Sequence, residues 1–97
     1  AADRHRFAPQ SAELAALQAE VAGWTVVDGA LQRQFAFSDY ARMMGFVNAV
    51  AWLAQREDHH PDLLVNWGRC TVRWHTHSVA GLSINDFICA AKVEDLA

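Results

Sequence analysis

The stretch that decides the fold is "WTVVDGALQRQFAFS", residues 24–38, in which two short apolar runs flank an Asp-Gly pair at 28–29. An Asp-Gly pair in this setting favours a two-residue β-hairpin turn, because such turns need positive φ at their central positions. Beyond the turn, Leu31, Phe35 and Phe37 alternate with more polar residues. The alternation predicts a strand with one buried face.

Helices are predicted on both sides of this hairpin. Residues 11–22 have Ser11 as N-cap, apolar residues at steps of three and four, and Gly23 as a stop signal. A longer helix follows Ser38, and Pro61 should end it at or before residue 59. We expect close packing around Gly45 to offset its low helix propensity. The expected apolar stripe of this second helix consists of Tyr40, Met43, Met44, Val47, Val50, Ala51 and Ala54. Phe46 and Trp52 fall outside it.

The stretch "DLLVNWGRCTVRWHTH", residues 62–77, predicts a second hairpin. With Gly68 in the first position of a type II′ turn, Trp67 faces Cys70 in the core and His60 lies opposite His77. A last helix should open at the capping box formed by Ser83 and Asp86.

The predicted order is therefore α-ββ-α-ββ-α, an α+β fold with one four-stranded antiparallel sheet and the helices packed on one face. With 97 residues and 53% apolar content, the chain suits a single domain over residues 1–97. We expect residues 1–10, which are polar and contain Pro9, to form a loosely held arm.

Composition argues against several classes of protein. The net charge is −3 and Lys and Arg form no cluster, so direct nucleic-acid binding is not expected. No apolar run reaches the roughly 18–20 residues of a membrane span. The spacing of Cys70 and Cys89 fits neither a zinc knuckle nor a disulfide framework. We expect both to be core residues. We expect a cytoplasmic protein.

Four of the five histidines fall in two segments, "EDHHPD" at residues 57–62 and "HTH" at residues 75–77. Opposed residues in an antiparallel pair have Cβ atoms about 4.5–5.5 Å apart, so the predicted register brings the segments together. His75 should lie one pleat away, near Asp62. The residues expected to ring one small cavity are Asp58, His59, His60 and His77.

Three interpretations of this cluster remain open on the residues alone. It could be a solvated polar strand end, with histidines in turn and cap positions. It could be a metal site, since histidines with a carboxylate form a known ligand set, although adjacent histidines diverge in direction. It could also be a metal-free acid/base site, because an imidazole with a pKa near 6.5 exchanges protons at neutral pH.

The motif formed by "DHHP", Trp67, His77 and Asp86 at their spacings resembles the signature of the pterin-4a-carbinolamine dehydratases. The stretches "QFAFSDYARMMGFV" and "HSVAGLSINDF" also resemble that family, over about residues 14–91. The resemblance implies a hydro-lyase that removes water from 4a-hydroxytetrahydropterin to give quinonoid dihydropterin, with no metal or organic cofactor. It thereby recycles the pterin of aromatic amino acid hydroxylases.

The resemblance also assigns roles to residues. His59 and His77 correspond to the acid/base pair, with His60 as a third catalytic or orienting group. The substrate-binding set implied is Asp58, His59, His60, His75, Thr76, His77 and Ser78. Trp24, Glu57 and Asp86 are weaker candidates, since a core position explains Trp24 and the capping box explains Asp86.

Two positions depart from the family pattern. Gln55 stands where relatives commonly have an acidic residue. If a carboxylate at that position helps to bind the pterin, this chain must bind it differently, and Glu57 is a candidate for that contact. His75 stands where relatives often have a small hydroxyl residue. The resemblance also implies a homo-oligomer, dimer or tetramer, and coupling to a hydroxylase. An alternative is a non-catalytic interaction module, because animal relatives serve as dimerisation cofactors of a homeodomain transcription factor.

Overall fold

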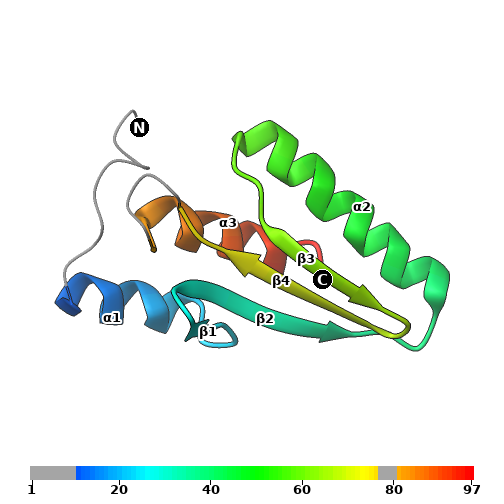
Figure 1. Cartoon of the computed structure of the whole chain (residues 1–97), viewed down its shortest axis with the longest axis horizontal. Helices are drawn as coiled ribbons and strands as arrows, with labels where there is room; N and C mark the ends of the chain where they lie inside the picture. The colour runs from blue at the N-terminus through cyan, green and yellow to red at the C-terminus, as the bar shows by residue number, and fades with distance from the viewer. Residues whose placement is uncertain (1–10, 77–80) are drawn as a thin grey trace.

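The computed structural model describes residues 11–76 and 81–97, and the N-terminal arm predicted at residues 1–10 lies outside these ranges. Seven elements occur in the predicted order, α-ββ-α-ββ-α (Figure 1). They are α1 (Ser11–Glu20), β1 (Thr25–Val27), β2 (Ala30–Ala36), α2 (Tyr40–Glu57), β3 (Asp62–Asn66), β4 (Arg69–Trp74) and α3 (Ile84–Glu94). The strands form one antiparallel sheet in the order β1-β2-β4-β3, which confirms the predicted fold class.

One face of the sheet carries the hydrophobic core. In β4, Cys70, Val72 and Trp74 are fully buried, while the residues between them are more exposed. Because side chains alternate between the two faces of a strand, the buried set faces the helices and the other set faces away from them. Helix α3 contacts both α1 and α2 and packs against β2 and β4 (Figure 1).

The first hairpin forms as predicted, with Val27 paired with Ala30 across the turn. Asp28 and Gly29 have φ of 49° and 77°, so both turn positions are left-handed. This is the conformation that the Asp-Gly pair predicts.

The second hairpin differs from the prediction, because its turn is Trp67–Gly68 and not Gly68–Arg69. Gly68 has φ of 81° in the second turn position, where a type II′ turn would need it in the first. The backbone oxygen of Gly68 accepts the Phe37 N–H at 2.8 Å, which ties the turn to the end of β2. Trp67, expected opposite Cys70 in the core, is instead 69% exposed at the hairpin tip.

This shift moves the pairing by two residues. Val65 lies opposite Cys70, and Asp62 lies opposite Arg73. A two-residue shift keeps the side chains of the residues that still pair on their predicted faces but changes their partners. The observed register therefore does not place His60 opposite His77, and that part of the prediction is wrong.

Helix α2 begins at a different cap and buries a different stripe than expected. Asp39, and not Ser38, is the N-cap, and its carboxylate accepts the Arg42 N–H at 3.1 Å. Tyr40 and Ala51, which were expected in the stripe, are exposed. The buried residues of α2 are Met43, Phe46, Val50, Leu53 and Ala54. The helix ends at Glu57, as Pro61 predicts.

Two glycines provide substitutions with opposite expected effects. A Cβ added to Gly45 would meet no atom within 4 Å, so the expected close packing is absent within the chain. Gly45→Ala should raise the free energy of unfolding by about 0.5–1 kcal/mol.

Gly68→Ala should lower the free energy of unfolding by about 1 kcal/mol or more, because φ at Gly68 is positive and the Cβ would lie 3.3 Å from the Phe37 oxygen.

Urea denaturation of the two variants measures both effects. A Gly68→Ala protein as stable as the wild type would contradict the turn geometry. A Gly45→Ala protein that is less stable than the wild type would contradict the open space beside the helix.

Candidate active site

The site begins where α2 ends in a Schellman motif, a turn that closes a helix through a left-handed residue. Asp58 is that residue, with φ of 51°. The Asp58 N–H bonds to the Gln55 oxygen at 3.4 Å, and the His59 N–H bonds to the Ala54 oxygen at 3.1 Å. A non-glycine residue in this conformation costs about 1–2 kcal/mol. The turn and the following Pro61 fix the direction in which His59 leaves the helix.

His59 is nearly buried and is held on two sides. Its Nε2 lies 2.6 Å from the Oδ1 of Asp86. Its ring stacks on Trp74, with centroids 5.3 Å apart and planes at 12°. These contacts come from α3 and β4, so the orientation of the imidazole depends on the packing of both elements.

Asp86 is fully buried and accepts hydrogen bonds from three groups. Besides His59, the Thr76 hydroxyl donates to Oδ2 at 2.8 Å, and the Ser83 N–H donates to the same oxygen at 2.8 Å. The last bond belongs to the predicted capping box of α3. Asp86 therefore serves as a helix cap and as the partner of a histidine at the same time.

Thr76, two residues after the end of β4, lies beside this carboxylate. Thr76 forms an isolated antiparallel bridge with Gly81, and the Thr76 N–H bonds to the Gly81 oxygen at 2.6 Å. The bridge brings the two ends of the intervening segment together. His77 and Ser78, predicted as site residues, fall in that segment and lie outside the described residues.

The predicted cluster is divided between the two faces of the sheet. His75 Nε2 lies 3.2 Å from Asp62 Oδ2, a contact that the sequence predicts. However, Trp74 faces the covered side, so the neighbouring His75 points to the open face with Arg73. His75 and His59 are therefore on opposite sides of the sheet, and the structure does not bring them together.

The remaining predicted residues differ in their environments. Asp58 and His60 are exposed at the end of α2, close in sequence to His59. Glu57 forms an ion pair with Lys92 at 2.8 Å. Trp24 is fully buried in the core, and its Nε1 donates to Glu94 Oε1 at 2.7 Å.

Cys70 and Cys89 are free cysteines, and both are buried. Burial raises the pKa of the Cys70 thiol, which disfavours the nucleophilic thiolate. Within residues 11–76 and 81–97, no group of three His, Cys, Asp or Glu side chains could hold a metal ion. The helices in those ranges are too short or too polar to cross a membrane.

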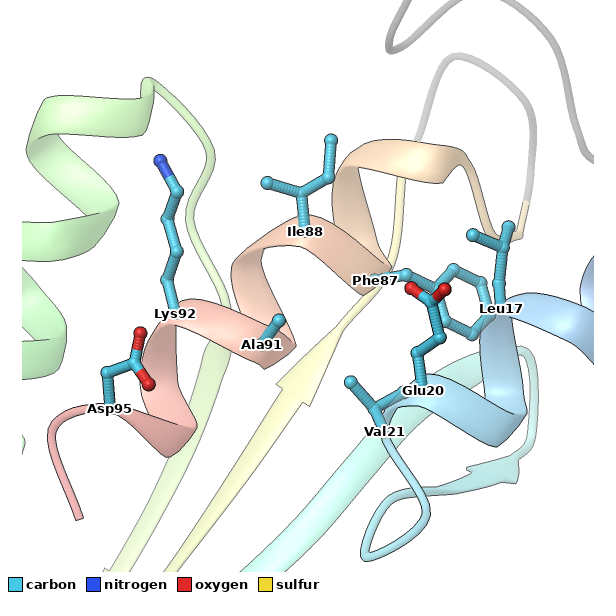
Figure 2. A pocket seen from close by; sticks show the side chains of 8 residues that line it. All are labelled: Leu17, Glu20, Val21, Phe87, Ile88, Ala91, Lys92 and Asp95. Carbon is cyan, nitrogen blue, oxygen red and sulfur yellow. The ribbon is translucent and has the colours of Figure 1, made fainter.

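A groove of about 260 Å³ lies between α1 and α3. Figure 2 shows Ile88 and Ala91 of α3 on one side of the groove, with Leu17 of α1 and Val21, the residue after α1, on the other. None of the predicted site residues within the described ranges lines it. A second hollow, of about 350 Å³, extends from the β1–β2 turn to His75 and Thr76 at the end of β4.

Sequence reasoning missed two features of the site. The stacking of Trp74 on His59 was not anticipated, although Trp74 occupies a core-facing position of the second hairpin. The contact between Asp86 and His59 was also missed, because the capping box alone explained that aspartate. The available signal was the place of Asp86 in the same spaced motif as "DHHP", Trp67 and His77.

These features define an α+β protein with a buried histidine–aspartate pair where α2, β4 and α3 meet. Residues 8–96 match the family described as pterin 4 alpha carbinolamine dehydratase. A protein of Xanthomonas campestris pv. campestris (strain 8004), named "Putative pterin-4-alpha-carbinolamine dehydratase", is 56% identical over 87 residues, covering 88% of this chain and 74% of that protein. A protein of the same name from Nitrosospira multiformis is 46% identical over 84 residues, covering 87% of this chain and 74% of its own length.

Solved structures agree with this assignment. The crystal structure of a transcriptional coactivator/pterin dehydratase from Brucella melitensis has a TM-score of 0.88 and 30% identity, covering 94% of this chain and 99% of that chain. A pterin dehydratase-like RuBisCO assembly factor of the alpha-carboxysome has a TM-score of 0.65 at 24% identity, covering 76% and 86% of the two chains. At this identity, the similarity to the second structure is evidence for the fold and not for a function. The chain belongs to the pterin-4a-carbinolamine dehydratase family.

The two His–Asp pairs allow a matched test of burial. Asp86→Asn leaves one acceptor oxygen where three donors need partners, so it should lower the free energy of unfolding by about 2 kcal/mol. Asp62→Asn should change it by less than about 1 kcal/mol, because Asp62 is 65% exposed. Thermal and urea denaturation of both variants would measure the difference. Equal losses would contradict the central role of Asp86.

Proposed function

We propose that this protein is a dehydratase that removes water from 4a-hydroxytetrahydropterin by histidine acid/base catalysis. Family membership supports the substrate class, and the observation that carries the chemistry is the buried His59–Asp86 pair. The reaction would take place in the cytoplasm and return the pterin to an aromatic amino acid hydroxylase. The proposal requires neither a metal nor an organic cofactor.

The elimination needs two proton transfers. The C4a–O bond breaks as one group protonates the leaving hydroxyl, which departs as water. The electron pair on N5 forms the C4a=N5 double bond, and a second group accepts the N5 proton. The net reaction consumes no proton, so the two groups must be in opposite protonation states at the start. Histidines suit this chemistry, because both of their forms are populated near neutral pH.

The geometry around His59 favours one arrangement of its protons. An ionised carboxylate only accepts hydrogen bonds, so the Nε2 facing Asp86 carries a proton. In the neutral ring, Nδ1 is then the nitrogen that accepts a proton. Stacking on Trp74 prevents the ring from turning away. His59 is thus oriented for proton transfer at Nδ1.

The other roles follow the family pattern and remain part of the proposal. His77 would be the second member of the acid/base pair, and His60 would bind and orient the pterin, as would Asp58. Gln55 is exposed and offers no carboxylate at the position where relatives commonly have one. Glu57 supplies a nearby carboxylate, but Lys92 already holds it in an ion pair. We therefore expect Glu57 to contact the pterin only if it exchanges that partner.

His59→Ala should reduce the enzymatic rate of carbinolamine dehydration by about 100-fold, in line with the loss of a placed proton-transfer group. His75→Ala is the matched control, because His75 lies on the open face, and should change the rate less than about threefold. Stopped-flow absorbance measures both rates, corrected for the spontaneous reaction. His77→Ala tests the second acid/base group in the same assay. Equal rates for wild type and His59→Ala would refute the proposed mechanism.

We further propose that the protein forms a homo-oligomer through the β3 side of the sheet. Strand β3 lies at an edge, where its outward backbone groups can pair with a second strand. Five of the nine large hydrophobic residues exposed in the described part of the chain are on α2, β3 and the turn after β3. They are Tyr40, Trp52, Leu64, Val65 and Trp67. A second copy of β3 would cover the edge and part of this apolar surface.

Leu64→Lys should convert the oligomer to a monomer, because it places a charge on the β3 edge. Val26→Lys is the control at the opposite edge of the sheet, where Val26 is also exposed on β1. Light scattering coupled to size-exclusion chromatography gives the molar mass of each variant. A wild-type protein that is monomeric at micromolar concentration, or a dimer that survives Leu64→Lys, would contradict the β3 interface.

A further inference from the structure

A pair of buried hydroxyl groups lies behind the His59–Asp86 contact. Thr76 Oγ1 is 2.8 Å from Ser83 Oγ and 2.8 Å from Asp86 Oδ2. Thr76 is 5% exposed, and Ser83 and Asp86 are fully buried. Polar groups at such depth are costly unless they are paired, so these hydrogen bonds constrain one another.

The chemistry of the groups fixes the direction of this chain. A hydroxyl has one proton to donate, and an ionised carboxylate has none. The Thr76 proton therefore goes to Asp86 Oδ2, and the Ser83 hydroxyl must donate to Thr76 Oγ1. Hydrogen bonds in such a series polarise and strengthen one another.

The same arrangement divides the two oxygens of Asp86 between different partners. Oδ2 accepts from the Thr76 hydroxyl and from the Ser83 N–H, while Oδ1 accepts from His59. Two donors on Oδ2 prevent the carboxylate from rotating about its Cβ–Cγ bond. Oδ1 is therefore held at one point against Nε2 of the imidazole.

We propose that Thr76 is a positioning residue, whose hydroxyl locks the Asp86 carboxylate and thereby selects the tautomer of His59 with the proton on Nε2. This inference rests on the proposed function and gives Thr76 a different role from the substrate contact that the sequence suggests. Loss of the hydroxyl would leave a single backbone donor on Oδ2. The carboxylate could then rotate, and both tautomers of His59 would be populated.

Thr76→Val removes the hydroxyl and keeps the shape of the side chain, while Thr76→Ser keeps the hydroxyl and removes a methyl group. Long-range ¹H–¹⁵N spectra of the histidine rings report the tautomer, at about pH 8.5 where an ordinary imidazole is neutral. In wild type and Thr76→Ser, we expect His59 to have a protonated Nε2 and an unprotonated Nδ1. In Thr76→Val, both nitrogen shifts should move toward the average of the two tautomers.

Kinetics provides the second readout. Thr76→Val should lower kcat about tenfold and change KM less than about twofold, since misplacing a reacting group mainly slows the chemical step. Thr76→Ser should restore kcat to within about twofold of wild type. If Thr76→Val does not fold, Thr76→Ala replaces it, because it also removes the hydroxyl donor to Asp86 Oδ2 and keeps the Ser83 N–H bond to that oxygen. We expect the same spectral shift in Thr76→Ala.

An unchanged His59 spectrum in the folded Thr76→Val protein, or in Thr76→Ala where that variant replaces it, would overturn the proposal. A kcat loss that Thr76→Ser does not restore would also overturn it. Failure of the proposed function is recognised separately. In that case wild type would not exceed the spontaneous dehydration rate, and the ring spectra alone would still decide the role of Thr76.

Discussion

The candidate site depends on one interaction, the burial of the Asp86 carboxylate among three hydrogen-bond donors. His59 comes from the turn after α2, Thr76 from the segment after β4, and Ser83 from the cap of α3. A buried charge without partners would be strongly destabilising, so each of the three segments must be in place to satisfy it. The carboxylate thus joins elements that are distant in sequence, and its two oxygens are committed to different partners. The orientation of His59 is a consequence of this packing.

The two His–Asp pairs consist of the same two side chains, but their environments give them different chemical roles. His75 and Asp62 face the open side of the sheet, where solvent weakens their interaction. His59 and Asp86 lie on the side of the sheet that the helices cover, with Trp74 stacked on the imidazole. Only the second pair has the rigidity that proton transfer to a bound substrate requires. The pleat of β4 separates them, because Trp74 and His75 are neighbours and so point to opposite faces.

Local signals in the sequence were sufficient for the order of the elements, the turn at Asp28 and the capping box of α3, since each depends on a few adjacent residues. Local signals were not sufficient for the register of the second hairpin. Gly68 can occupy either position of a two-residue turn, and both registers keep the paired residues on the same faces. The contact of His59 with Asp86 spans 27 residues and exists only once α3 has packed against the sheet. Periodicity carries no information about such a contact. The family resemblance supplied the catalytic assignment, and the part of it that concerns His77 remains a prediction.

The central claim is that a pterin binds at the end of α2, on the side of His59, and not on the open face of the sheet. An NMR titration of the histidine-labelled protein with biopterin, a stable oxidised pterin, tests this most directly. The ring signals of His59 and His60 should shift with a saturable dependence on biopterin, while those of His75 stay in place. Shifts confined to His75, or no saturable shift at any histidine, would contradict the account.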